Sequence, residues 1–219
     1  MKATLRLRIA WLKVIGHRAV FLSVMLLVLV ATPGRAGLLG DASIPFSADR
    51  TLTIDGRLYD GRVYQVPGHA RHEQELRGTK LVVLLDAAAA HGTLILPGLN
   101  SYVDFAFPKA IMILSDEHLL GASLGYESID GIRTTKYRVD RSEKDGTRVK
   151  GVVWRSSAGI VMKLEGTVMR PGAQKPTAIK MELSNLELGP QDSSLFAVPP
   201  GLVKLPPETL KPLLGRTDP

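Results

Sequence analysis

Two stretches near the C-terminus alternate between apolar and polar residues, and this pattern limits what the chain can fold into. In residues 178–183, Ile179, Met181 and Leu183 are separated by charged residues, and in residues 160–168 every second residue is apolar or glycine. A period of two places all apolar side chains on one face of a β-strand. The pattern therefore predicts an antiparallel sheet that is covered on one side only.

The chain after Phe46 reads as a series of short strands separated by turns. Residues 81–85 are apolar at every position, which predicts a strand buried on both faces. Asp-Gly pairs favour tight turns because glycine tolerates a positive φ, although the pair at Asp60-Gly61 can also be a bulge inside a strand. The other pairs are Asp55-Gly56, Asp130-Gly131 and Asp145-Gly146. The remaining predicted strands cover residues 93–96, 102–105, 133–139 and 149–154.

Helical signals are few. The segment from Pro108 to Leu120 predicts a helix that ends at Gly121. Asp192 is the expected N-cap of a single turn that runs to Phe196, and residues 207–214 predict a short terminal helix. With about ten antiparallel strands and so little helix, the sheet either closes into a barrel or curls over a few helices. We therefore predict a mainly β domain.

The N-terminus predicts an export signal. Five basic residues and no acid precede an apolar run from Ala19 to Ala31, and small residues follow up to Ala36. This order defines a secretory signal peptide, and the run is shorter than the ~20 residues of a membrane span. We predict cleavage after Ala36 and a periplasmic location. The alternative is an inner-membrane anchor that stays attached, because apolar residues extend back to Trp11.

Removal of residues 1–36 leaves enough chain for one domain. About 180 residues bury roughly 70% of their unfolded surface, which is sufficient for a hydrophobic core. We divide the remainder into a lead-in at 37–45, a β domain at 46–203 and a C-terminal tail at 204–219 that includes the terminal helix.

The charge of the chain falls mostly on the predicted signal. The sequence has 28 basic and 21 acidic residues, and six of the basic ones lie in residues 1–36, which hold no acid. The remainder thus has 28 − 6 = 22 basic and 21 acidic residues. We expect no nucleic-acid partner, because such a partner requires a basic patch on the folded domain. Since the chain has no cysteine, disulfides, thiolate metal sites, a cysteine nucleophile and N-terminal lipid attachment are excluded.

No group of residues predicts catalysis or a bound metal. His69 and His72 lie three positions apart in an expected strand, so they face opposite sides, and we interpret them as exposed surface residues. Glycine-rich segments lack the strand–helix context and the lysine of nucleotide-binding loops. The spacing of the acidic residues does not place two carboxylates together for acid–base catalysis. We therefore expect that the protein is not an enzyme and binds neither a cofactor nor a metal. The acidic residues considered are Asp104, Asp116, Glu117, Glu127 and Asp130.

The apolar face of the two alternating strands has two explanations. It can be core beneath a covering helix, which is the default for any apolar stripe. Because predicted helix is scarce and the sheet is long, it can instead line a cavity in which adaptable methionines contact a lipid or acyl chain. A protein-interaction or envelope-sensor module with a packed interior is the alternative function. The predicted lining residues are Trp154, Ile160, Met162, Leu164, Met181 and Leu183.

Several motifs, taken in order, resemble those of LolA-like periplasmic proteins. Each motif alone is short, but together they cover about residues 46–203. The motifs are the strand–Pro–strand element Tyr64 to Glu73, the stretch Leu81 to Asp86, Leu94-Ile95-Leu96-Pro97 with Tyr102, the G-x-x-T-x-x-Y strand Gly131 to Tyr137, Trp154 with Gly159-Ile160, and the closing F-x-x-P-x-G at Phe196, Pro199 and Gly201.

The resemblance implies a single curled antiparallel sheet that forms an open, incomplete barrel, with short helices covering it and a cavity for acyl chains. The carriers of this family ferry lipoproteins between the two membranes, and related domains sense envelope stress or bind other lipids. Val66 stands where the carriers have an arginine, and Ala70 where they have an aromatic residue; both positions are implicated in handing over lipoproteins. The resemblance therefore implies a relative of the carriers with its own ligand. We expect a monomer whose partner is a lipid or an acylated protein, with transient membrane or envelope-protein contacts.

Overall fold

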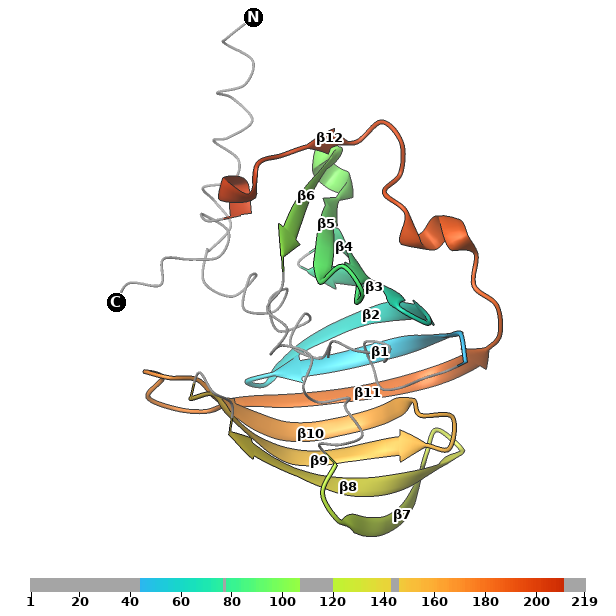
Figure 1. Cartoon of the computed structure of the whole chain (residues 1–219), viewed down its shortest axis with the longest axis vertical. Coiled ribbons are helices and arrows are strands. Elements are labelled where there is room, and N and C mark those ends of the chain that lie inside the picture. The colour runs from blue at the N-terminus through green and yellow to red at the C-terminus, as the bar shows by residue number, and fades with distance from the viewer. Residues whose placement is uncertain (1–43, 77, 107–119, 143–145, 211–219) are drawn as a thin grey trace, which may run out of the picture.

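A single twelve-stranded sheet holds most of the residues that the structure describes (Figure 1). The structure, a computed structural model, describes residues 44–76, 78–106, 120–142 and 146–210. The strands lie in the order β12-β6-β5-β4-β3-β2-β1-β11-β10-β9-β8-β7, and every neighbouring pair is antiparallel except β12 and β6. The outermost strands, β12 and β7, do not pair with each other, so the predicted mainly β, open sheet is confirmed.

The described strands are β1 (Phe46–Ile54), β2 (Arg57–Val66), β3 (His69–Leu76), β4 (Thr79–Asp86), β5 (His91–Leu96), β6 (Ser101–Ala106), β7 (Ser123–Ile129), β8 (Ile132–Ser142), β9 (Arg148–Ser156), β10 (Val161–Met169), β11 (Thr177–Leu188) and β12 (Val203–Lys204). Three single 3₁₀ turns accompany them within the described ranges: η3 (Pro97–Leu99), η6 (Ser193–Phe196) and η7 (Pro207–Leu210).

The few predicted helical segments have different outcomes. The turn at η6 is confirmed, since the Asp192 carboxylate accepts a hydrogen bond from the backbone N–H of Ser194 at 2.8 Å. The terminal helix predicted at 207–214 is described only as far as η7, which is a 3₁₀ turn. The helix predicted from Pro108 and the signal segment 1–36 lie outside the described residues. None of the helical turns in the described ranges is long and apolar enough to cross a membrane.

Tight hairpins form where two Asp-Gly pairs predicted them. At Asp55-Gly56 both residues have positive φ, +48° and +80°, and the pair at Asp130-Gly131 has +49° and +75°. These are the dihedrals of a type I′ turn, whose twist matches that of the flanking strands. Asp60-Gly61 is neither a turn nor a bulge, because β1 and β2 pair in unbroken register through it.

Gly61 is required by a close approach of neighbouring strands. It pairs with Arg50 of β1 on one side and with Gln74 of β3 on the other. A Cβ atom at Gly61 would lie only 2.1 Å from the backbone oxygen of Glu73. The pairing of β2 with β3 ends at this glycine, and Figure 1 shows β4, β5 and β6 running up the picture while β1, β2 and β11 run across it. Glycine thus permits the bend at which the sheet changes direction.

The two faces of the sheet bury different amounts of apolar surface. We call the face that carries Leu52, Val63, Val153 and Leu183 the inner face; these residues belong to the main buried cluster. The opposite, outer face holds a second, smaller cluster of Val82, Leu84 and Ile95, which Tyr102, Val198 and Leu202 cover. The C-terminal segment after β11 passes η6 and returns beside β6 as β12 (Figure 1). Strand β4 is therefore buried on both faces, as its sequence predicted.

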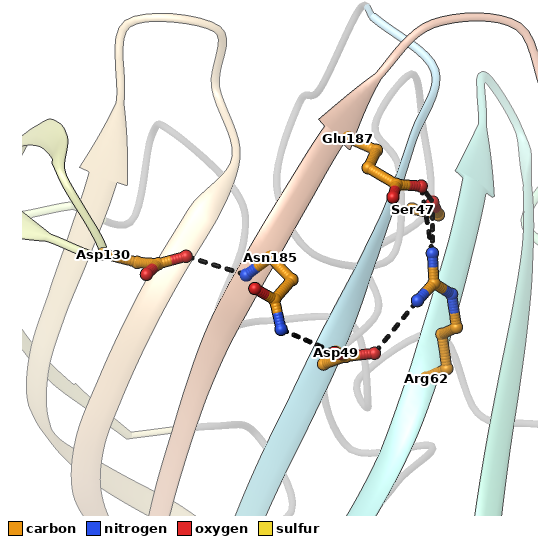
Figure 2. Close-up of polar contacts among 6 residues, drawn as sticks. All are labelled: Ser47, Asp49, Arg62, Asp130, Asn185 and Glu187. Atoms are coloured by element: carbon orange, nitrogen blue, oxygen red, sulfur yellow. Dashed lines mark hydrogen bonds and ion pairs between the residues drawn. The ribbon is translucent and has the colours of Figure 1, made fainter.

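A polar network fixes a bulge in β11 on the outer face (Figure 2). The register of β1 and β11 shifts at this point, and Asn185 has a φ of +51°. The Asn185 side-chain amide donates to Asp49 at 2.8 Å, and the Asn185 backbone N–H donates to Asp130 at 2.7 Å. Figure 2 also shows Arg62 bridging Asp49 and Glu187. The charged side chains are partly exposed and pair with one another, so they contribute little to stability. The network positions the β7–β8 turn against β11.

Candidate functional site

Five of the six predicted lining residues come together around β10 and β11. Leu164 lies directly opposite Met181 across the two strands, and Met181 in turn lies opposite Leu52 of β1. All five side chains are at most 4% exposed and belong to the main buried cluster. The five are Ile160, Met162, Leu164, Met181 and Leu183. Met162, Leu164, Met181 and Leu183 form the central apolar surface of the inner face in the described part of the chain. Ile160 pairs with Ser156 beyond the bulge between Val161 and Lys163, so the register places it on the outer face.

Trp154 lies on the other face of the sheet from the four inner-face residues. Although Trp154 belongs to the main buried cluster, it follows Val153 in β9, and Val153 lies opposite Leu164. Strand alternation therefore places Trp154 on the outer face. There the ammonium groups of Lys136 and Lys163 lie 4.7 and 4.9 Å from the centroid of its ring. The prediction that Trp154 lines the same apolar surface is corrected.

Glu127 completes the outer-face cluster around Trp154. The indole Nε1 donates to the Glu127 carboxylate at 2.7 Å. This hydrogen bond, with the nearby charge of Lys136, holds the pKa of the Glu127 carboxyl below its usual value. The partners of Trp154 thus satisfy its polar edge and place two cations against its ring, which is the environment of a structural tryptophan.

A group of buried polar residues interrupts the inner face beside the apolar surface. We call Arg50 of β1, Gln65 of β2, and His72 and Gln74 of β3 the polar cluster; none is more than 4% exposed. The Arg50 guanidinium lies 2.6 Å from His72 Nδ1 and donates to Gln74 Oε1 at 3.3 Å. Because Gly61 stands between Arg50 and Gln74 in the sheet, no side chain blocks this crossing of β2. The cluster was not predicted from the sequence.

His72 is held neutral in this environment. Burial lowers its pKa well below the ordinary value of 6.5, and the charge of Arg50 lowers it further. Since a guanidinium only donates hydrogen bonds, the Nδ1 atom of His72 must accept, and the ring proton therefore resides on Nε2. The interpretation of both histidines as exposed is wrong for His72 and correct for His69. As expected, the two side chains face opposite sides of β3.

The neutral His72 makes folding sensitive to acid. Below about pH 6.5 an unfolded chain takes up a proton at this residue whereas the folded chain does not. The free energy of unfolding therefore falls as the pH drops, by up to about 1.4 kcal/mol per pH unit. We expect the urea midpoint to decrease between about pH 7.5 and 5.5, and to decrease less in His72→Asn, whose amide oxygen can still accept from Arg50. Equal pH slopes for the two proteins would contradict a neutral His72.

An apolar hollow adjoins the lining where two glycines face each other. Gly151 of β9 and Gly166 of β10 are paired, and a Cβ atom on either would lie within 2.5 Å of the neighbouring backbone. The hollow has a volume of about 10 Å³, with Leu164 and Ile179 in its wall. This is the space of about one water molecule, so an acyl chain cannot occupy the hollow unless the surrounding packing opens.

The acidic residues considered for catalysis are separated by the fold. Asp104 accepts hydrogen bonds from Thr93 at 2.7 Å and pairs with Lys204 at 2.8 Å, which attaches β12 to β6. Glu127 is bound to Trp154, and Asp130 to Asn185. No group of three or more potential metal ligands occurs among the residues that the structure describes. Asp116 and Glu117 lie outside those residues.

The two positions that depart from the LolA-like carriers lie on β2 and β3. Val66 is the last residue of β2 and pairs with His69, the first of β3. Ala70 is fully buried and faces Gln65 across the same strand pair. The small side chain of Ala70 therefore adjoins the polar cluster.

Comparison with known proteins finds similarity in structure and not in sequence. No protein-family model and no curated protein matches the chain. Among solved structures, an uncharacterized conserved protein from Thermus thermophilus is 12% identical with a TM-score of 0.49, over 75% of this chain and 91% of that one. A chain of the Pseudomonas aeruginosa MucA/MucB complex is 16% identical with a TM-score of 0.45, over 72% of this chain and 57% of that one.

A third similar structure is a putative outer membrane lipoprotein-sorting protein domain from Vibrio parahaemolyticus. It is 12% identical with a TM-score of 0.35, over 71% of this chain and 91% of that one.

Proposed function

We propose that this chain is exported to the periplasm and binds a hydrophobic ligand, a lipid or an acyl chain, on the inner face of its open sheet. The observation that carries the proposal is the apolar surface in which Leu164, Met181 and Leu52 lie side by side on three adjacent strands. Methionine side chains are flexible and polarizable, so Met162 and Met181 can adapt to ligands of different shape.

The open sheet supplies a route to this buried surface. Because β7 and β12 are unpaired with each other, the sheet can open without breaking a strand pairing. A ligand would then replace the mutual packing of the lining residues with its own apolar contacts. Each Å² of the ligand's apolar surface that is removed from water contributes about 25 cal/mol, and this favours such an exchange.

Mass spectrometry under native conditions tests the proposal. The full chain is purified, stripped of lipid and exposed to vesicles of a dipalmitoyl phospholipid. We expect a species with bound lipid in the wild type. In Met181→Gln, which places an amide on the lining, we expect the bound fraction to fall by about tenfold, since an apolar pocket discriminates against an unpaired polar group. The melting temperature of each variant shows whether the sheet is still folded.

Met169→Gln is the matched control. Met169 is the last residue of β10 and follows Val168, which belongs to the buried cluster, so its side chain points to the outer face. The same chemical change there should leave lipid binding unaltered. Absence of bound lipid in the wild type under all conditions would overturn the proposal and favour the alternative, a protein-interaction or envelope-sensor module with a packed interior.

A further inference from the structure

The polar cluster holds more buried hydrogen-bond donors than it uses. Within the part of the chain that the structure describes, no partner contacts Arg50 Nε, His72 Nε2, Gln74 Nε2 or either polar atom of Gln65. The Nδ1 atom of His72 and the Oε1 atom of Gln74 already accept from Arg50. What remains is therefore donor-rich, with Gln65 Oε1 as the single acceptor in this set. Buried polar atoms are nearly always paired in folded proteins, so this imbalance calls for a group with several acceptor oxygens.

The positive charge of the polar cluster also indicates that an anionic group is missing from it. Arg50 is 3% exposed, and burial lowers its pKa to about 10, which still leaves it cationic at neutral pH. Its described contacts are His72 and Gln74, and neither carries a negative charge. A buried cation is costly unless an anion compensates it. A carboxylate or phosphate would supply both the charge and the acceptors, and its oxygens fit a guanidinium well.

The position of the cluster fixes the kind of molecule that would carry this anion. Arg50 pairs with Leu183 on the side opposite to Gly61, and the next inward-facing pair along the same strands is Leu52 with Met181. The cationic group therefore adjoins the apolar lining directly. A ligand that covers both surfaces must be amphiphilic, with an anionic group at one end of an apolar chain.

We propose that the inner face binds an anionic amphiphile, with its carboxylate or phosphate held by Arg50, Gln65, His72 and Gln74 and its apolar chain along β10 and β11. This inference rests on the proposed function and adds the chemical class of the ligand. It assigns a ligand-binding role to Arg50 that the apolar lining by itself does not require.

The test compares palmitate with methyl palmitate, which has the same chain and no charge. Binding of each to the full-length wild-type protein is measured by calorimetry at about pH 8, where the carboxylate is ionised. We expect palmitate to bind at least about tenfold more tightly, in line with a hydrogen-bonded charge pair. An excess of inorganic phosphate should not displace palmitate, because a free anion lacks the apolar chain.

A pair of variants attributes this preference to the cluster. Arg50→Met should bind the two ligands with equal affinity, and it retains the apolar length of the side chain. Arg57→Met is the matched control, since Arg57 is exposed at the start of β2, and it should keep the wild-type preference. The comparison of the two ligands on wild-type protein does not depend on how either variant folds.

The outcomes separate the two proposals. Equal affinity of the wild type for both ligands would overturn the anionic subsite and leave lipid binding intact, with the cluster then satisfied by water. Binding of neither ligand would overturn the proposed function itself. Displacement of palmitate by phosphate would show an anion site that does not use the apolar surface, and it too would contradict the amphiphile.

Discussion

Gly61→Ala should lower the free energy of unfolding by about 3 kcal/mol or prevent folding, the upper range for a group forced into a packed interior. The added Cβ would lie 2.1 Å from the backbone oxygen of Glu73. That oxygen belongs to the backbone and cannot move aside as the end of a flexible side chain can. Strands β2 and β3 must therefore separate at the point where Arg50 crosses β2 to reach β3. Urea unfolding followed by circular dichroism measures the loss.

Gly98→Ala provides the control for this prediction. Gly98 lies in the η3 turn, and a Cβ atom there meets nothing within 4 Å. We expect it to be as stable as the wild type or slightly more stable, because alanine restricts the unfolded chain. If Gly61→Ala unfolds at the same urea concentration as Gly98→Ala, the close approach of β2 and β3 is not required for this fold.

Trp154→Ala should lower the free energy of unfolding by about 3–5 kcal/mol, as the removal of other buried aromatic side chains does. The ring is 4% exposed and packs between side chains of β8 and β10, with Glu127 of β7 at its edge. Its removal should loosen the β7–β10 part of the sheet. Thermal unfolding measures the effect, and Trp154→Phe should lose less because a ring still fills the space.

Lipid binding by the Trp154→Phe variant tests whether Trp154 lies on the ligand-binding inner face or on the outer face. Because Trp154 lies on the outer face, folded Trp154→Phe protein should bind lipid as the wild type does, in contrast to Met181→Gln. A variant that melts near the wild-type temperature yet binds no lipid would contradict this placement, and it would return Trp154 to the ligand-lining residues.

The alternation of apolar residues was sufficient to predict the sheet and part of its burial. Leu81 to Leu85 are apolar throughout, and β4 is indeed covered on both faces. The Asp-Gly pairs at Asp55 and Asp130 form the predicted hairpins. These predictions succeed because strand alternation and turn dihedrals are local properties, which a few adjacent residues determine.

The polar cluster leaves a signal in the alternation of the sequence. Arg50 occupies the same alternation phase as Ala48 and Leu52 in β1, and His72 and Gln74 occupy the phase of Ala70 in β3. Polar residues at positions that should face the core are exceptions to the binary pattern, and such exceptions mark functional or strained sites. The mutual contact of the three side chains depends on the pairing of β1, β2 and β3, which the pattern alone does not specify.

The sequence by itself determined the mainly β fold, the hairpins, the capped turn at Asp192 and most of the apolar inner surface. Only the tertiary structure decided that Gly61 lies inside a strand, that Trp154 faces outward and that Arg50 reaches His72 and Gln74 across Gly61. The physical reason is that the alternation of residues sets the two faces of each strand locally, whereas strand order and register decide which side chains become neighbours. Those neighbours give the inner face both an apolar and a cationic part.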